Sequence, residues 1–187
     1  MNEFVEQKID SRDILGIVSL GIFAAAGLQG FIAFSGLHKL FPAYIETVQG
    51  RMFSYPFVYK VMLYGIASPA IEEILFRWGL FLVPIKKLKL NVFLAGFISS
   101  VLFGLSHGNM VQFCYAFLFG LLLSFEAYGH KNIAAPVLSH GAANVFTVSM
   151  YEIGVEFDPV WALALIPAIL IFLIRNLAQR KLSSQSQ

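Results

Sequence analysis

Charge is what this sequence has least of. Only 13% of its 187 residues are charged and 58% are hydrophobic, whereas about a quarter of an average soluble domain is charged. The mean hydropathy is +0.73, and a net charge of +2 is too small to indicate a nucleic-acid partner. The composition therefore predicts a protein surrounded by membrane lipids, with no nucleic acid among its partners.

Cysteine is almost absent too. The single residue, Cys114, lies in an apolar run, which excludes an internal disulfide and a cysteine-based zinc site. Residues 1–13 are polar and carry charges of both signs, without the short apolar core and cleavage site of a secretory signal peptide. We expect cytoplasmic tails at residues 1–13 and 175–187, on either side of one membrane-embedded domain at residues 14–174.

Six apolar runs approach the length that a bilayer requires, which is about 20 residues per helix. They cover residues 14–34, 56–83, 92–106, 110–127, 133–150 and 159–174, and the breaks between them contain Pro, Gly and Lys. No internal repeat is visible. The pattern predicts an all-α fold, a polytopic membrane helix bundle of about six transmembrane helices.

The basic residues are distributed unevenly over the loops. With six spans, both termini and the loops at 84–91 and 128–132 share one side. The other side carries Lys39 and Arg51, with Lys60 near the start of its helix. The first side carries nine Lys and Arg residues: Lys8, Arg12, Lys86, Lys87, Lys89, Lys131, Arg175, Arg180 and Lys181. Because Lys and Arg favour the cytoplasmic face, we expect both termini in the cytoplasm and a prokaryotic plasma membrane as the location.

The second run contains three charges in the stretch SPAIEEILFRWGL, residues 68–80. A charged Asp, Lys or Arg at the centre of a spanning helix costs roughly 2.5–3.5 kcal/mol. Glu73 and Arg77 are four residues apart, so they are expected to pair on one helix face. Glu72 lies about 100° around the helix and has no partner there. We therefore interpret Glu73 and Arg77 as a structural ion pair and Glu72 as a candidate general base acting on water.

Pro69 lies just before these charges. Proline removes one backbone hydrogen bond, and the carbonyl that it leaves unpaired in an α-helix is that of Gly65. The sequence predicts a kink here that opens space beside Glu72.

Two of the four histidines lie at membrane depth. His107 ends the third run, and His140 lies in the fifth run with Asn144 one helical turn later; we expect His38 and His130 to be solvated. Taken singly, such residues are explained by hydrogen bonds between helices. Together with Glu72 they form a set that suits activation of water and stabilisation of an oxyanion. The set Glu72, His107 and His140 also suits zinc, although the sequence lacks the HExxH signature of helical zinc proteases.

These motifs resemble the CPBP family of intramembrane proteases, also called the CAAX protease and bacteriocin-processing (Abi) family. The family pattern EExxxR, FxxxH, HxxxN reads here as Glu72, Glu73 and Arg77, then Phe103 and His107, then His140 and Asn144, within residues 60–150. The resemblance implies an endopeptidase that cuts a membrane-associated peptide or protein at a membrane-proximal site. By it, Glu72 activates water with assistance from His107, His140 and Asn144 form an oxyanion hole, and Glu73 with Arg77 holds the first motif helix. Metal-free and zinc-assisted chemistry both remain open.

Two other functions fit the same sequence. A non-enzymatic protein for bacteriocin self-immunity, or a chaperone-like membrane protein, would not use Glu72 as a base. A small transporter would place the acids on a water pathway, but no two similar halves are visible. In straight helices, Glu72, His140 and His107 would lie about 16, 11 and 22 Å from the cytoplasmic ends. Their convergence therefore requires tilt, a later helix start or a break near Gly104.

Overall fold

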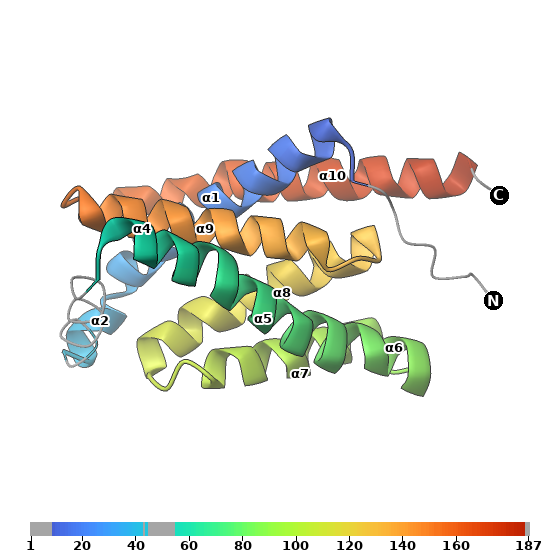
Figure 1. Cartoon of the computed structure of the whole chain (residues 1–187), viewed down its shortest axis with the longest axis horizontal. Coiled ribbons are helices and arrows are strands. Elements are labelled where there is room, and N and C mark those ends of the chain that lie inside the picture. The colour runs from blue at the N-terminus through green and yellow to red at the C-terminus, as the bar shows by residue number, and fades with distance from the viewer. Residues whose placement is uncertain (1–8, 43, 45–54, 186–187) are drawn as a thin grey trace.

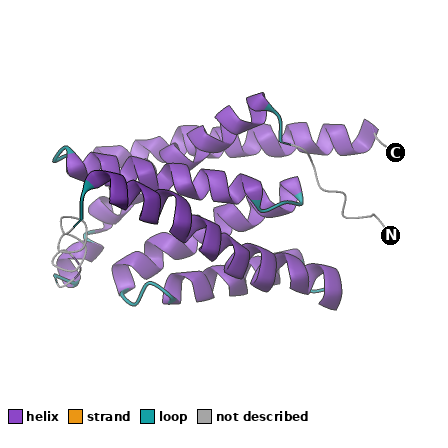
Figure 2. Cartoon of the chain, in the orientation of Figure 1, coloured by secondary structure: helices purple, strands orange, loops and turns teal. Residues whose placement is uncertain are grey.

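The computed structural model describes residues 9–42, 44 and 55–185. The described part consists of helices joined by short turns and loops, and it contains no strand (Figure 2). Its elements are α1 (Ser11–Ser35), α2 (Leu37–Leu40), a composite helix over residues 57–88, α7 (Val92–Leu105), α8 (Met110–His130), α9 (Ala134–Glu152), η3 (Pro159–Ala164) and α10 (Leu165–Gln185). The all-α prediction is confirmed, and each of the six apolar runs lies in helix. Lys8 and Arg51 lie outside the described residues.

The long helices run side by side along one axis (Figure 1). The start of α1, the end of α10, α6 (Val83–Leu88) and the turn between α8 and α9 lie at one end of the described structure. We call it the basic end because it carries eight of the nine basic residues predicted to be cytoplasmic, all except Lys8. The opposite end carries α2 and the turn between α7 and α8. The grouping of loops expected from the charge pattern is therefore the one that the fold produces.

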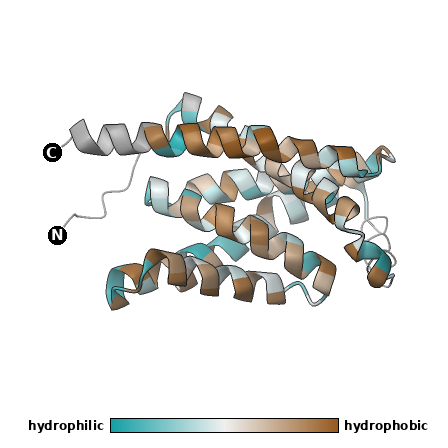
Figure 3. Ribbon diagram, turned by 180° about the vertical axis from the view of Figure 1, so that it is seen from behind, coloured by the Kyte–Doolittle hydropathy of each residue, from teal (hydrophilic) through white to brown (hydrophobic). Residues whose placement is uncertain are grey.

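Three helices of the described chain are long and apolar enough to cross a membrane, at residues 13–35, 110–130 and 159–177. α7 has 14 residues and rises about 21 Å, less than the roughly 30 Å of a bilayer core. The helices nevertheless consist largely of hydrophobic residues (Figure 3), and many of these are exposed, with Phe34, Phe93 and Leu88 each more than 70% exposed. Lipid is the surrounding that suits such a surface, and the count of six spans stays a prediction.

The composite helix departs from regular α-geometry on both sides of the acidic motif. It consists of α4 (Phe57–Lys60), the π-helical stretch η1 (Val61–Ala67), α5 (Ser68–Glu73), a second π-helical stretch η2 (Ile74–Leu82) and α6. In η1 the Ser68 N–H donates to the Leu63 carbonyl, five residues back. With the same five-residue spacing, the Tyr64 carbonyl would accept a hydrogen bond from the backbone of residue 69, but Pro69 has no N–H. At the kink predicted beside Pro69 the structure has a π-helical stretch, and the carbonyl that Pro69 leaves free is that of Tyr64 rather than Gly65.

Glycines in α1 set the distance to its neighbours. A Cβ on Gly21 would lie 2.1 Å from the Ser139 carbonyl oxygen of α9, and a Cβ on Gly30 would lie 2.1 Å from the Ala162 backbone nitrogen of η3. No side chain fits at such distances, so glycine is required at both positions. This close contact between α1 and α9 positions the helix that carries His140 and Asn144.

Replacing Gly21 by Ala is therefore expected to destabilise the fold by about 1–3 kcal/mol, because the new methyl group forces α1 and α9 apart. The measurement is the thermal unfolding midpoint in detergent micelles. Gly79→Ala is the matched control: its Cβ meets no atom closer than 3.5 Å, so it should leave the midpoint unchanged or raise it slightly. Equal midpoints for Gly21→Ala and Gly79→Ala would contradict the close contact.

Candidate active site

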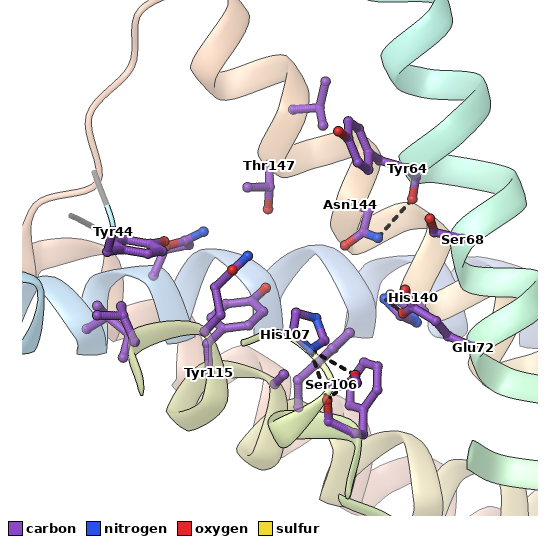
Figure 4. Close-up of a pocket in the computed structure, with 18 of the residues that line it drawn as sticks. Tyr44, Tyr64, Ser68, Glu72, Ser106, His107, Tyr115, His140, Asn144 and Thr147 are labelled. Carbon is purple, nitrogen blue, oxygen red and sulfur yellow. Dashed lines mark hydrogen bonds and ion pairs between the residues drawn. The ribbon is translucent and has the colours of Figure 1, made fainter. Parts of the chain in front are cut away.

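The three sequence motifs converge on one cavity of about 340 Å³ (Figure 4). Glu72 reaches it from α5, His107 from the turn between α7 and α8, and His140 and Asn144 from α9. The difference in depth between Glu72 and His107 disappears because the composite helix continues past Pro84 to Leu88. Glu72 then lies about 24 Å from the end of its helix, close to the roughly 22 Å of His107.

His140 joins both glutamates of the first motif. Its Nδ1 lies 2.8 Å from Glu73 Oε1, and its Nε2 lies 3.6 Å from Glu72 Oε2. The other oxygen of Glu73, Oε2, lies 3.1 Å from Arg77 Nε. The four side chains form a continuous polar row, in which the predicted pair of Glu73 and Arg77 also fixes an imidazole. Glu73 is therefore more than a counter-ion, which the sequence reasoning missed.

The inner part of this row is sealed from the surroundings. The side chains of Glu73 and Arg77 are both 0% exposed, and the Arg77 Cζ lies 4.3 Å from the centre of the Phe103 ring, within cation–π range. Nη1 and Nη2 of Arg77 have no hydrogen-bond partner among the described residues. Because isolated buried charges are costly, the Glu73 carboxylate is stabilised by Arg77 on one side and by His140 on the other.

His107 is oriented by its own motif. Its Nδ1 lies 2.9 Å from the Phe103 carbonyl oxygen. A carbonyl only accepts, so Nδ1 carries the proton, and Nε2 is left as an acceptor. The Phe103 ring also meets the rings of His107 and His140 edge to face, with centroids 5.0 and 5.7 Å apart. Phe103 is thus the apolar side chain around which His107, His140 and Arg77 are assembled.

Asn144 connects two helices. Its Nδ2 donates to the Tyr64 carbonyl oxygen at 2.8 Å, which is the carbonyl that Pro69 leaves free. This bond is the kind of hydrogen bond between helices that explains a single polar residue in a membrane span. One N–H of the amide and its Oδ1 remain, and the residue lines the cavity, so the bond also holds a donor in place beside Glu72 and His140.

The prediction that His130 is solvated is wrong. It is buried rather than solvated, because α8 continues through it and its end packs inside the bundle. Nδ1 of His130 donates to the Glu126 carbonyl oxygen at 3.0 Å, and Nε2 accepts from Arg175 Nη2 at 2.8 Å. His38 lies in α2 and is partly exposed, as expected.

Two buried charges at other positions were missed. Glu126 in α8 is buried within the bundle. Lys60 is buried as well and forms an ion pair with Glu152 at the end of α9. In the sequence, Lys60 and Glu126 are each a single charge near the end of an apolar run. Charged residues at the membrane interface have the same pattern, so the sequence does not reveal that these two are buried.

The candidate zinc ligands do not assemble into a metal site. Among the described residues, no three His, Cys, Asp or Glu side chains are grouped closely enough to hold a metal ion. Both nitrogens of His140 face carboxylates, and Nδ1 of His107 is taken by a carbonyl. Zinc-bound histidines usually donate their other ring N–H to a carbonyl or a carboxylate, so these contacts do not exclude zinc-assisted chemistry.

Comparison with known proteins gives the family. Residues 54–146 match the family described as "Type II CAAX prenyl endopeptidase Rce1-like". This segment is an Rce1-like domain. It contains all the motif residues, and its bounds agree with the 60–150 expected from the motifs. The match confirms the CPBP resemblance for this segment.

A bacterial relative carries a similar segment. The chain is 33% identical over 90 residues to the "Putative membrane peptidase YdiL" of Bacillus subtilis (strain 168). The match covers 48% of this chain and 36% of the relative, so it extends over about a third of that protein's length. No solved structure matches the chain. The apolar helices and the Rce1-like domain together locate the protein in a membrane.

Proposed function

We propose that this protein is an intramembrane endopeptidase in which Glu72 activates a water molecule for attack on a peptide bond. The observation that carries the proposal is the position of Glu72 on the cavity wall, 3.6 Å from a histidine that Glu73 holds from behind. A positioned carboxylate within reach of a polar cavity is the requirement for general-base catalysis. The Rce1-like domain supports the same reaction class.

The reaction follows from these positions. The Glu72 carboxylate takes a proton from water, and the hydroxide adds to the scissile carbonyl carbon, which gives a tetrahedral intermediate. Glu72 then returns the proton to the amide nitrogen, the C–N bond breaks, and an amine and a carboxylic acid leave. His107 Nε2, an acceptor, holds the second proton of the water. The roles of proton acceptor and proton donor are the ordinary ones of a general base that becomes a general acid.

The developing oxyanion requires hydrogen-bond donors. The free N–H of Asn144 is one of them, and Nε2 of His140, which faces Glu72, is the second. Donors fixed in advance stabilise the transition state more than mobile ones, since no reorganisation is needed when the charge forms. Asn144 is fixed by Tyr64 and His140 by Glu73, so both donors are held by neighbours that do not take part in the reaction.

The experiment that tests the proposal compares cells with the wild-type chain and cells with a Glu72→Gln chain at equal abundance. Peptides from the membrane fraction and the medium are identified by mass spectrometry, with new termini marked by isotopic labelling. Peptides found only with the wild type support a peptidase. Identical peptide sets in the two strains would overturn the proposal and favour an immunity or chaperone-like role, and ion flux in liposomes would favour a transporter.

Replacing Glu73 by Gln is expected to lower kcat by about 10²-fold or more and to leave KM nearly unchanged. Glu73 orients His140 in the way that a buried carboxylate orients the histidine of a catalytic triad. It is fully buried and absent from the described cavity lining, so substrate does not touch it. The kinetics are measured on the purified protein in micelles with a peptide identified as above. An unchanged kcat, in a variant shown by thermal unfolding to be folded, would contradict the positioning role.

A further inference from the structure

The cavity occupies only one half of the bundle. In α1 it reaches Gln29 and Ile32 but no earlier residue, and in the composite helix it reaches no further than Glu72. In α8 it is lined only by the first half, and none of its described lining comes from α6 or α10. The cavity therefore extends from Glu72 toward the end opposite the basic end, where Tyr44 and Tyr151 lie at its margin.

The charges of the chain distinguish these two ends. Of the 13 Lys and Arg residues in the sequence, nine lie in the two terminal segments and in the loops at 84–91 and 128–132, and Arg77 is buried in the interior. The other three are Lys39 and Lys60, which lie at the end opposite the basic end, here called the cavity end, and Arg51, which is outside the described residues. Of those three, Lys60 is paired with Glu152. Short loops with an excess of Lys and Arg stay in the cytoplasm. The basic end is therefore assigned to the cytoplasmic face and the cavity end to the non-cytoplasmic face.

We propose that the cavity opens to the non-cytoplasmic face, and that the substrate is an uncharged peptide segment displayed on that face beside the membrane. The substrate part rests on the proposed function, and the direction of opening does not. A peptide reaching Glu72 passes hydroxyl and amide side chains that hydrogen-bond to a peptide backbone. Those nearest its path are Tyr44, Tyr64, Gln112, Tyr115, Thr147 and Tyr151.

The lining supports an uncharged segment. No Lys or Arg is among the described lining residues, so a free C-terminal carboxylate of the substrate meets neither side chain in the described cavity. Burial, with a smaller contribution from Tyr151, raises the pKa of the Tyr44 phenol, so its hydroxyl stays protonated and neutral. The segment nearest Glu72 therefore lies inside the substrate chain, which is the requirement of an endopeptidase.

The direction of opening is tested by thiol labelling of the full-length chain in spheroplasts, with Cys114 replaced by Ser. Leu40→Cys at the cavity end and Leu88→Cys at the basic end are matched, since the two side chains are 74% and 75% exposed and each neighbours a lysine. The reagent is the membrane-impermeant cation methanethiosulfonate ethyltrimethylammonium. We expect Leu40→Cys to react in intact spheroplasts and Leu88→Cys only after permeabilisation. The reverse pattern, or reaction of both in intact spheroplasts, would overturn the proposal.

A cysteine inside the cavity tests its connection to that face. Thr147 points into the cavity (Figure 4), and its hydroxyl donates to the Ala143 carbonyl of its own helix. We therefore expect the thiol of Thr147→Cys to react with the same reagent when it is added outside intact spheroplasts. Protection of Thr147→Cys, with Leu40→Cys labelled, would overturn an outward opening. Labelling requires no catalysis and should be the same in a Glu72→Gln background. Outward labelling without any Glu72-dependent peptides would therefore refute the peptidase and retain the orientation.

Wild-type-dependent peptides identify the substrate side directly. If the proposal is right, their new termini map to non-cytoplasmic segments close to a membrane span, and the residues around the cleaved bond carry few charges. Peptides that map mainly to cytoplasmic segments would overturn the substrate part even if the protein is a peptidase.

Discussion

Glu72→Gln is expected to lower kcat/KM for peptide cleavage by about 10²–10⁴-fold, the range that general-base catalysis contributes. Glutamine preserves the size and polarity of the side chain but cannot accept a proton at neutral pH. The Glu72 side chain is 30% exposed in the cavity, and the histidine beside it, His140, is held by Glu73. The substitution therefore removes the base without removing a buried structural charge, and the abundance and unfolding midpoint should change little.

Two further variants show whether this loss belongs to the base itself. Glu72→Asp keeps a carboxylate but withdraws it by one methylene, so it should retain more activity than Gln. Thr147→Val removes another polar group from the cavity wall and should cost less than about tenfold, because it is not placed to take a proton from water. Full activity of Glu72→Gln would refute the role of Glu72, and equal losses in Glu72→Gln and Thr147→Val would indicate substrate binding rather than catalysis.

The sequence was sufficient for the helices and for the composition of the site. Apolar runs of about 20 residues are long-range signals that do not depend on tertiary contacts, so five of the six helical segments agree with the runs to within about five residues. The sixth, α10, continues eleven residues past its run to Gln185. The ion pair of Glu73 with Arg77 follows from local spacing alone. The motifs identified Glu72, His107, His140 and Asn144 as members of one site, and all four line one cavity.

What the sequence could not provide are contacts between residues far apart in the chain. The regular spacing of an α-helix separated Glu72 from Glu73 by about 100° and suggested separate roles. A histidine 67 residues away from Glu73 lies between them and joins both. The π-helical stretches were also invisible, because five-residue spacing has no hydropathy signal of its own, and they shift the free carbonyl to Tyr64. The burial of His130 depends on Arg175, which is 45 residues away.

Arg77→Met should be the most destabilising of these substitutions, with an expected loss of about 3–5 kcal/mol of unfolding free energy, the cost of removing one partner of a buried ion pair. Methionine fills much of the volume but leaves the buried Glu73 carboxylate with only His140 beside it. The contact of the guanidinium with Phe103 is lost as well. The measurement is reversible unfolding in mixed micelles, and Arg77→Lys should recover part of the loss, since it keeps the charge but not the planar stacking.

A double variant separates the ion pair from packing. If the cost of Arg77→Met comes from the unpaired Glu73 carboxylate, then Glu73→Gln in the same chain should restore part of the stability, with a coupling energy of about 1 kcal/mol or more, as for residues in one network. Strict additivity of the two changes would show that Arg77 acts only by filling space. The double variant should still be inactive, because the neutral amide introduced by Glu73→Gln would no longer orient His140. Recovery of stability without recovery of activity would thus distinguish the two functions of Glu73, which balances Arg77 in the interior and fixes the histidine at the cavity.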